Sequence, residues 1–207
     1  IDMIISDNVA LSGGGLNSDR EDQSKLSSTL IYNNSSYWGG GIYSYQSDIE
    51  FMDVIIDQNS SKYGGGVYLK ENSPKMDRIT ISNNQSINSG GGIYLWNSGI
   101  NLINSILIDN VSYDAGGAIS LMNDNNHNIE FTELSKVTIV GNTAYQKGSS
   151  IYIANNTVAE NFAYNPKFIN LTIANNKKYT TSYDNGCMIY AYQSEPIFTN
   201  MIYWGNE

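Results

Sequence analysis

The hydrophobic residues of this chain lie in short alternating segments that recur about every 25 residues. In each repeat a β-branched run such as VIIDQN or ITISNN ends in an asparagine. Apolar residues stand three, five and eight positions before that asparagine. A spacing of two is the period of a β-strand, whereas the step from eight to five breaks the alternation and predicts a bend. The marking asparagines are Asn8, Asn34, Asn59, Asn84, Asn110, Asn142, Asn176 and Asn206.

Glycine clusters form a second marker with the same period. Triplets begin at Gly13, Gly39, Gly64 and Gly90, a GGA variant begins at Gly116, and the steps between them are 26, 25, 26 and 26 residues. Glycine loses more conformational freedom on folding than any other residue, so a repeated triplet indicates a corner that needs positive φ or close backbone approach. We expect about three short strands and three corners in each repeat. Turn-forming residues stand at the remaining bend, namely Asp53, Asn104, Asn170 and Asn200.

A unit of about 25 residues cannot bury its own apolar face, but identical units can stack on one another. The pattern therefore predicts an all-β fold, a right-handed parallel β-helix (β-solenoid) of about 7–8 coils, with residues 1–207 as a single domain. Neighbouring coils would lie ~4.8 Å apart, the spacing of paired strands. The asparagines would then form a ladder of side-chain amides inside one corner.

Aromatic residues occupy outward positions just after the glycines, and we call them the tyrosine face. One hypothesis is that stacked rings only stabilise the sheet. The other is that they form a platform for a sugar or a protein partner. The tyrosine face consists of Tyr43, Tyr45, Tyr68, Tyr94, Trp96, Tyr152, Tyr190 and Tyr192. A second outward column is unusually apolar and could pack against a partner, and it contains Ile4, Leu30, Ile55, Thr80, Ile106, Thr138, Thr172 and Ile202.

Two insertions interrupt the regular repeat, near residues 122–134 and 154–167. They fall at the same part of consecutive coils, so we expect them to protrude side by side, and loops on a rigid scaffold often carry function. Ionisable residues gather in them, although a solvated polar loop pair explains the same composition. These residues are Asp124, His127, Glu130, Glu133 and Glu160.

Composition narrows the classes of partner. The formal net charge is −9 and only 15% of residues are charged, which argues against a nucleic-acid binder, since such proteins need a basic face. No apolar run approaches ~18 residues, so no membrane span is expected. The single cysteine, Cys187, excludes a disulfide within the chain. The chain begins with Ile1 and has no signal peptide, so we expect it to be a piece of a longer array.

No catalytic residue is predicted. A hydrolase of this fold would need paired carboxylates, and a lyase would need clustered carboxylates for Ca²⁺ with an Arg or Lys base. We see neither arrangement along the chain, and we expect His127 to be solvated and Cys187 to be a small buried filler. No cofactor is expected apart from Ca²⁺, for which Asp19 and Asp22 in NSDRED and Asp124 in NDNN are the candidate ligands.

The GGGIY…N repeats resemble the right-handed parallel β-helix of the pectin-lyase-like superfamily, and more narrowly the repeats of exported bacterial surface and polymorphic outer-membrane proteins. The resemblance implies bacterial export and an extracellular or cell-surface location. It implies a non-catalytic adhesin, stalk or assembly element, with a polysaccharide, a surface protein or secretion machinery as partner. The alternative is a carbohydrate-binding or polysaccharide-degrading module, although the NTD, DD, GHG and RIK motifs of galacturonase-like enzymes are absent.

Overall fold

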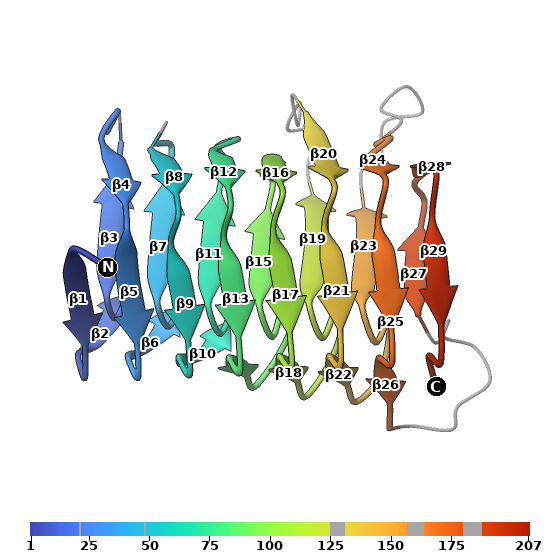
Figure 1. Ribbon diagram of the computed structural model, residues 1–207, viewed down its shortest axis with the longest axis horizontal. Helices are drawn as coiled ribbons and strands as arrows, with labels where there is room; N and C mark the ends of the chain where they lie inside the picture. The colour runs from blue at the N-terminus through green and yellow to red at the C-terminus, as the bar shows by residue number, and fades with distance from the viewer. Residues whose placement is uncertain (21, 48, 125–130, 157–163, 180–187) are drawn as a thin grey trace.

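The computed structural model describes residues 1–20, 22–47, 49–124, 131–156, 164–179 and 188–207. The described residues form 29 short β-strands and no helix of the length and hydrophobicity needed to cross a membrane. The strands stack in a row of coils, with the N-terminus at one end of the row and the C-terminus near the other (Figure 1). All strand pairs are parallel and each strand pairs with its equivalents in the neighbouring coils. The predicted parallel β-helix is therefore confirmed.

Each complete coil contributes one strand to each of four sheets, here called A to D in chain order. Sheet A contains β1 (Met3–Ser6), β5 (Thr29–Tyr32), β9 (Ile55–Asp57), β13 (Thr80–Ser82), β17 (Ile106–Ile108), β21 (Thr138–Val140), β25 (Thr172–Ala174) and β29 (Ile202–Trp204). Sheet B contains β2 (Val9–Ser12), β6 (Ser35–Trp38), β10 (Ser60–Tyr63), β14 (Gln85–Ser86), β18 (Val111–Ser112), β22 (Thr143–Ala144) and β26 (Lys177–Lys178). Sheet C contains β3 (Leu16–Asp19), β7 (Ile42–Tyr45), β11 (Val67–Lys70), β15 (Ile93–Trp96), β19 (Ile119–Asp124), β23 (Ile151–Asn156) and β27 (Ile189–Tyr192). Sheet D contains β4 (Lys25–Ser27), β8 (Glu50–Met52), β12 (Lys75–Asp77), β16 (Ile100–Ile103), β20 (Thr132–Ser135), β24 (Lys167–Ile169) and β28 (Ile197–Thr199).

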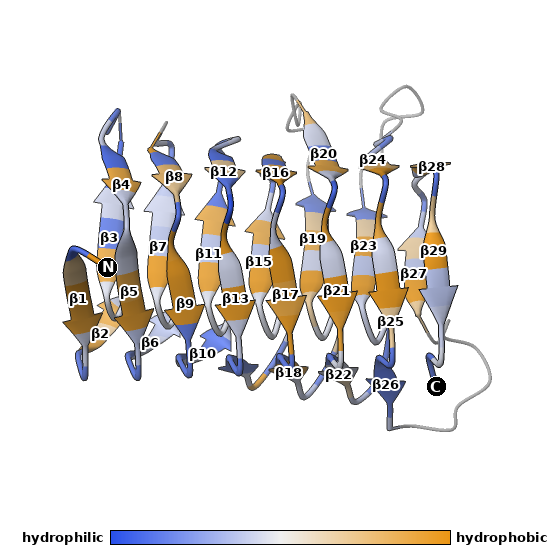
Figure 2. Cartoon of the chain, viewed as in Figure 1, coloured by the Kyte–Doolittle hydropathy of each residue, from blue (hydrophilic) through white to orange (hydrophobic). Residues whose placement is uncertain are grey.

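The expectation of three strands in each coil is wrong, because the segment between asparagine and glycine forms sheet B. The strands of sheet B are only two to four residues long, as in β10 and β14. Their inward residues are mostly small and polar, such as Ser61 and Ser86. Figure 2 shows the contrast between the hydrophilic strands β10 and β26 and the hydrophobic strands β9 and β17 of sheet A. Without an apolar column, sheet B left no alternating pattern in the sequence.

The core consists of the predicted apolar columns, which run through the coils as continuous stacks. In sheet A the inward column is fully buried from β5 to β25, and it contains Ile31, Ile56, Ile81, Leu107, Ile139 and Ile173. Residues in one column pair in exact register, as Ile81 does with Leu107. At ~25 cal/mol per Å² of apolar surface, the burial of each such side chain stabilises the fold by about 1.5–3 kcal/mol relative to exposure.

The asparagine ladder is confirmed along its whole length. The side-chain amide and the backbone N–H of Asn84 both donate to Oδ1 of Asn110, each at 3.0 Å. Asn84 in turn accepts from Asn59, whose amide nitrogen and backbone nitrogen lie 3.0 and 2.9 Å away. The amide of Asn84 also donates to the carbonyl of Ile56 in the preceding coil. The ladder therefore satisfies buried backbone groups at the corner between sheets A and B.

The corners adopt the backbone conformation that the sequence predicts. The first glycine of each cluster has positive φ, for example 64° at Gly64 and 72° at Gly90. A Cβ on either residue would strike the carbonyl oxygen three residues later. The four turn residues at the bend between sheets D and A also have positive φ, between 50° and 55°. Asn and Asp tolerate this conformation better than other residues with a Cβ.

Candidate functional site

The tyrosine face forms stacks along sheet C, but two of its rings are not at the surface. Tyr43, Tyr68 and Tyr94 stack in register, with ring centroids 5.4 and 5.1 Å apart. Tyr68 and Tyr94 are only 7% and 3% exposed, so the expectation that these tyrosines decorate the surface is wrong. The reason is that side chains from sheet B lean against them from the other side of the glycine corner.

Tyr63 at the end of β10 lies against Tyr94, with ring centroids 5.3 Å apart. Around this contact, aromatic residues of sheets B and C line a cleft of about 400 Å³, here called the aromatic corner cleft. Its described lining residues are Trp38, Tyr63, Tyr68, Asn88, Ser89, Tyr94, Trp96, Asp114 and Met122. They come from four successive coils, so at ~4.8 Å for each step the cleft runs about 14 Å along the helix axis.

The glycine triplet explains why the cleft forms at this corner. Only Gly64, Gly65 and Gly66 separate β10 from β11, so Tyr63 and Tyr68 begin the outer walls on either side of a very tight turn. Stacked glycines leave no side chain in the angle between the two sheets. Large aromatic residues on both sides then face one another across it, and the corner becomes a cleft with a rigid backbone.

Polar groups stand at one end of the cleft. The Ser89 hydroxyl donates to Oδ2 of Asp114 at 3.0 Å, and the backbone N–H of Asp114 donates to the carbonyl of Asn88 at 3.2 Å. Within the described part of the chain, the side-chain amide of Asn88 and the phenol oxygens of Tyr63, Tyr68 and Tyr94 have no hydrogen-bond partner. The cleft thus combines apolar ring faces with donors and acceptors that can orient a polar ligand.

The electrostatics of the cleft follow from its burial. Burial, followed by neighbouring tyrosines, raises the pKa of Tyr68 and of Tyr94 far above the usual range. Both rings therefore stay neutral hydrogen-bond donors at physiological pH. Lysines lie over several rings around the cleft: the Lys62 ammonium is 5.7 Å from the Tyr63 ring centroid, and the Lys70 ammonium is 4.7 Å from that of Tyr45.

The remaining tyrosines of the predicted face are not brought into the cleft. Tyr152 and Tyr190 form a separate stack, with centroids 5.4 Å apart, because Ser120 occupies their column in β19 and interrupts the ladder. Tyr192 is exposed on β27. The tyrosine face is therefore two groups of rings. From the first group Tyr68, Tyr94 and Trp96 line the cleft, whereas Tyr43 and Tyr45 are not among its described lining residues.

Five cleft residues that precede the glycines were not predicted from the sequence: Trp38, Tyr63, Asn88, Ser89 and Asp114. These residues stand in two columns, one and two positions before the first glycine. The nearer column is aromatic only at Trp38 and Tyr63, and the other changes residue type from coil to coil, so neither gives a regular pattern. A further stack was also missed on the outer side of sheet B, where Tyr145 lies 4.8 Å from Tyr113 and 4.7 Å from Tyr179, centroid to centroid. A signal was present, since these tyrosines all stand three residues after a marking asparagine.

The candidate Ca²⁺ ligands lie apart or are already hydrogen-bonded. Asp22 accepts from the Ser18 hydroxyl at 2.8 Å and the Ser24 N–H at 2.9 Å, and its pKa is lowered chiefly by Ser24. Asp124 accepts from the Asn97 amide at 2.7 Å. Among the described residues, no three His, Cys, Asp or Glu side chains gather as a metal site would require. A Ca²⁺ site at these residues or at Asp19 stays a prediction.

The two insertions start from neighbouring strands in register, since Asp124 in β19 pairs with Asn156 in β23. Residues 125–130 and 157–163 of these insertions lie outside the described residues. The predictions on His127, Glu130, Glu160 and Cys187 therefore remain untested. Glu133 lies on β20 in register with Lys167 on β24.

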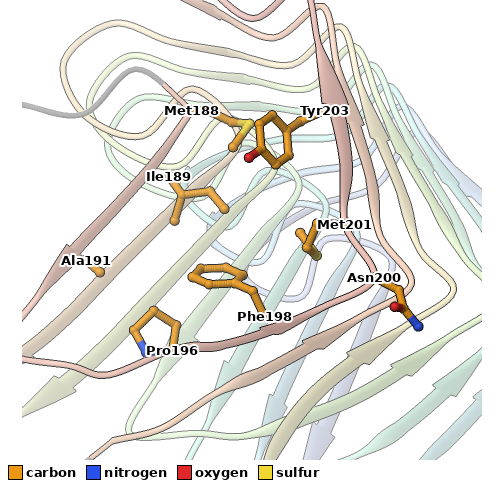
Figure 3. A pocket seen from close by; sticks show the side chains of 8 residues that line it. All are labelled: Met188, Ile189, Ala191, Pro196, Phe198, Asn200, Met201 and Tyr203. Atoms are coloured by element: carbon orange, nitrogen blue, oxygen red, sulfur yellow. The ribbon is translucent and has the colours of Figure 1, made fainter.

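Two other hollows are less suited to a specific polar ligand. One of about 590 Å³ lies over sheet B, where the only charged lining residue described, Lys62, is held by the Tyr37 hydroxyl at 2.8 Å. The other, of about 550 Å³, opens at the last coil, where Phe198 lies between Ile189, Pro196 and Met201 (Figure 3). Its lining continues the apolar core columns, as Phe198 does by pairing with Phe168, so it belongs to the core rather than to a separate cleft.

A family model described as a right-handed beta helix region matches residues 2–110 of the chain. The match covers 109 of the 207 residues and includes the first four glycine triplets and most of the cleft. No curated protein and no solved structure matches the chain.

Proposed function

Because this chain belongs to the right-handed β-helix family, we propose that it is a non-catalytic binding scaffold whose aromatic corner cleft holds a carbohydrate. The observation that carries this proposal is the joining of five aromatic rings from two sheets, with a carboxylate and a side-chain amide at one end of the same cleft. Flat apolar rings stack on the C–H faces of sugars, and a few fixed polar groups then give orientation.

The rigidity of the scaffold supports a binding role. The cleft walls are strands of continuous parallel sheets, fixed by the glycine corner and by ring contacts such as Tyr63–Tyr94. A preorganised site loses little entropy when a ligand binds. The lining residues come from four successive coils, so the cleft runs along the helix axis and suits a linear oligosaccharide.

We favour binding over cleavage because the described lining of the cleft has fewer carboxyl groups than hydrolysis requires. Hydrolysis of a glycosidic bond by the usual mechanism uses two carboxyl groups on either side of that bond. The described lining of the cleft contributes one, Asp114. A polysaccharide-degrading enzyme is therefore the weaker proposal for this cleft.

We also propose that the chain works at the cell surface or outside the cell, as an adhesin or a stalk. The support is the resemblance of its GGGIY…N repeats to those of exported bacterial surface proteins. Such a role fits a long scaffold that presents one cleft on its side.

The proposal is tested by screening the purified chain on a glycan array beside a Trp96→Ala variant. Trp96 is only half-buried, so its loss should remove a wall of the cleft and leave the fold intact. Trp204→Ala, at an exposed tryptophan of the last coil, is the matched control. We expect binding by the native chain and the control, and a loss of at least about tenfold in Trp96→Ala. Absence of binding by the native chain, or equal binding by all three, would refute the proposal.

A second candidate function, assembly with another protein, is favoured by the outer face of sheet A. Its outward column exposes Ile4, Ile106 and Ile202 by 61%, 43% and 60%. Exposed aliphatic side chains in one column of a sheet are typical of a contact surface. Analytical ultracentrifugation of the native chain and of an Ile106→Lys variant tests this by measuring self-association. If copies of the chain contact one another through sheet A, the substitution would bury a charge in that contact and weaken it.

A further inference from the structure

We propose that the carbohydrate held in the aromatic corner cleft carries a protonated amine, and that Asp114 selects this group. The inference rests on the proposed function, because it names the class of glycan for the same cleft. Three observations support it: the single charged residue in the described lining of the cleft, the neutral ring faces and the charge of the whole chain.

Hydrogen bonds fix both the backbone and the side chain of Asp114 in the wall of the cleft. Its backbone N–H is held by the carbonyl of Asn88, and its Oδ2 accepts from the Ser89 hydroxyl, a residue only 8% exposed. Within the described chain Oδ1 has no partner, and no lysine or arginine is paired with this carboxylate. A fixed, half-buried carboxylate with an open oxygen attracts an ammonium group, and a charge-assisted hydrogen bond is about twice as strong as a neutral one.

The rings of the cleft favour the same charge. The face of an aromatic ring is negative, so a cation within about 6 Å of its centroid is attracted to it. The chain already uses this contact beside the cleft, where the Lys62 ammonium lies 5.7 Å from the Tyr63 ring centroid. It uses it again at the separate Tyr152–Tyr190 stack, where the Lys147 ammonium lies 5.5 Å from the Tyr190 ring centroid. Because Tyr68 and Tyr94 remain neutral, no ring of the cleft floor adds a competing full charge.

The same features act against an acidic polysaccharide. Asp114 is the only charged residue in the described lining, and it would repel a uronic acid carboxylate. The formal net charge of −9 adds a long-range repulsion of the same sign. A neutral glycan would stack on the rings but would leave the Asp114 carboxylate without a counter-charge.

The test uses three β-1,4-linked tetrasaccharides of the same backbone geometry, which differ only at carbon 2 of each ring. Glucosamine tetramer carries an ammonium there, N-acetylglucosamine tetramer an amide, and cellotetraose a hydroxyl. Binding is measured by isothermal titration calorimetry at mildly acidic pH, where the amine is protonated and an aspartate is ionised. The variants are Asp114→Asn and, as the matched control, Asp109→Asn, at an exposed aspartate of another corner.

We expect the native chain and Asp109→Asn to bind the glucosamine tetramer at least about tenfold more tightly than cellotetraose, the factor that one charge-assisted hydrogen bond supplies. Asp114→Asn should bind the three oligosaccharides with similar affinity, and so should the native chain at a pH that deprotonates the amine. Equal binding of all three by the native chain would overturn the inference and leave the proposed function standing. A preference for the glucosamine tetramer that survives in Asp114→Asn would overturn the role of Asp114. Binding of none of the three oligosaccharides would overturn the inference for this backbone geometry. The glycan array separately decides whether any glycan binds.

Discussion

The rings of Tyr63 and Tyr94 lie 5.3 Å apart at an interplanar angle of 47°, although they belong to different sheets and to neighbouring coils. Tyr63 ends β10 in sheet B, and Tyr94 follows the first residue of β15 in sheet C. This contact closes the angle at the glycine corner from the outside. It turns a row of stacked tyrosines into a cleft with two walls.

Replacing Tyr63 with alanine should open the cleft and expose Tyr94. We expect a loss of about 1–2 kcal/mol in the free energy of unfolding, since an aromatic pair contributes about 0.5–1.5 kcal/mol beyond the area that it buries. Urea denaturation followed by circular dichroism measures it. Tyr192→Ala is the control, because that tyrosine is exposed. Equal stability of the two variants would show that the Tyr63–Tyr94 contact does not hold the corner.

Removal of one rung of the asparagine ladder should be far more costly. In Asn84→Ala the backbone N–H and amide of Asn59 lose their acceptor, and the carbonyl of Ile56 loses a donor, all inside the core. An unsatisfied buried polar group costs about 1–3 kcal/mol, so we expect a loss of at least about 3 kcal/mol. The neighbouring exposed position supplies the control, Gln85→Ala, which should change stability by about 0.5 kcal/mol or less. A small effect in Asn84→Ala would mean that the corner can repack without the ladder.

Within one glycine triplet, the first and third positions should differ. Gly90→Ala places a Cβ at φ 72° and against the Ile93 carbonyl. Gly92 has no positive φ, and the next coil carries Ala118 at the equivalent position. We expect Gly90→Ala to lose about 3 kcal/mol or more, and Gly92→Ala clearly less. The melting temperatures of the two variants measure the difference, and a reversed order would contradict the account of the corner.

Alkaline pH should destabilise the fold through the tyrosines of the cleft. Burial raises the folded-state pKa of Tyr68 and Tyr94 above the unfolded value near 10. The folded state then holds protons that the unfolded state releases, so stability is unchanged below pH ~10 and falls as pH rises above it. The absorbance of tyrosinate, recorded with circular dichroism, should show part of the tyrosines ionising only when the chain unfolds. Complete ionisation in the folded chain would show that these rings are accessible.

The fold could be predicted from the sequence because each coil repeats the same physical solution. The buried position of Ile56 follows from strand alternation, and the ladder position of Asn84 follows from its fixed place after a β-branched run. Sheet B was missed because residues such as Ser61 and Ser86 give short strands no apolar column. Within each repeat, the spacing of apolar residues, asparagines and glycines along the chain therefore predicts most of the fold.

Only part of the lining of the cleft could be predicted from the sequence. Tyr68 and Tyr94 follow the glycines in one regular column and Trp96 stands two residues further on, so their shared face was visible in the sequence. Trp38, Tyr63 and Asp114 come from the other side of the corner, where the positions before the glycines carry different residue types from coil to coil. Which side chains meet across a corner depends on its angle, and the spacing of residues along the chain does not contain that angle.

The most direct test of the account is tryptophan fluorescence in a Trp204→Phe variant. The chain has three tryptophans, and the two that remain, Trp38 and Trp96, both line the aromatic corner cleft. We predict that titration with the best glycan of the array gives a saturable change in emission, and that its midpoint agrees with the affinity from calorimetry. Binding seen by calorimetry with no change in tryptophan emission would place the carbohydrate elsewhere and contradict the account.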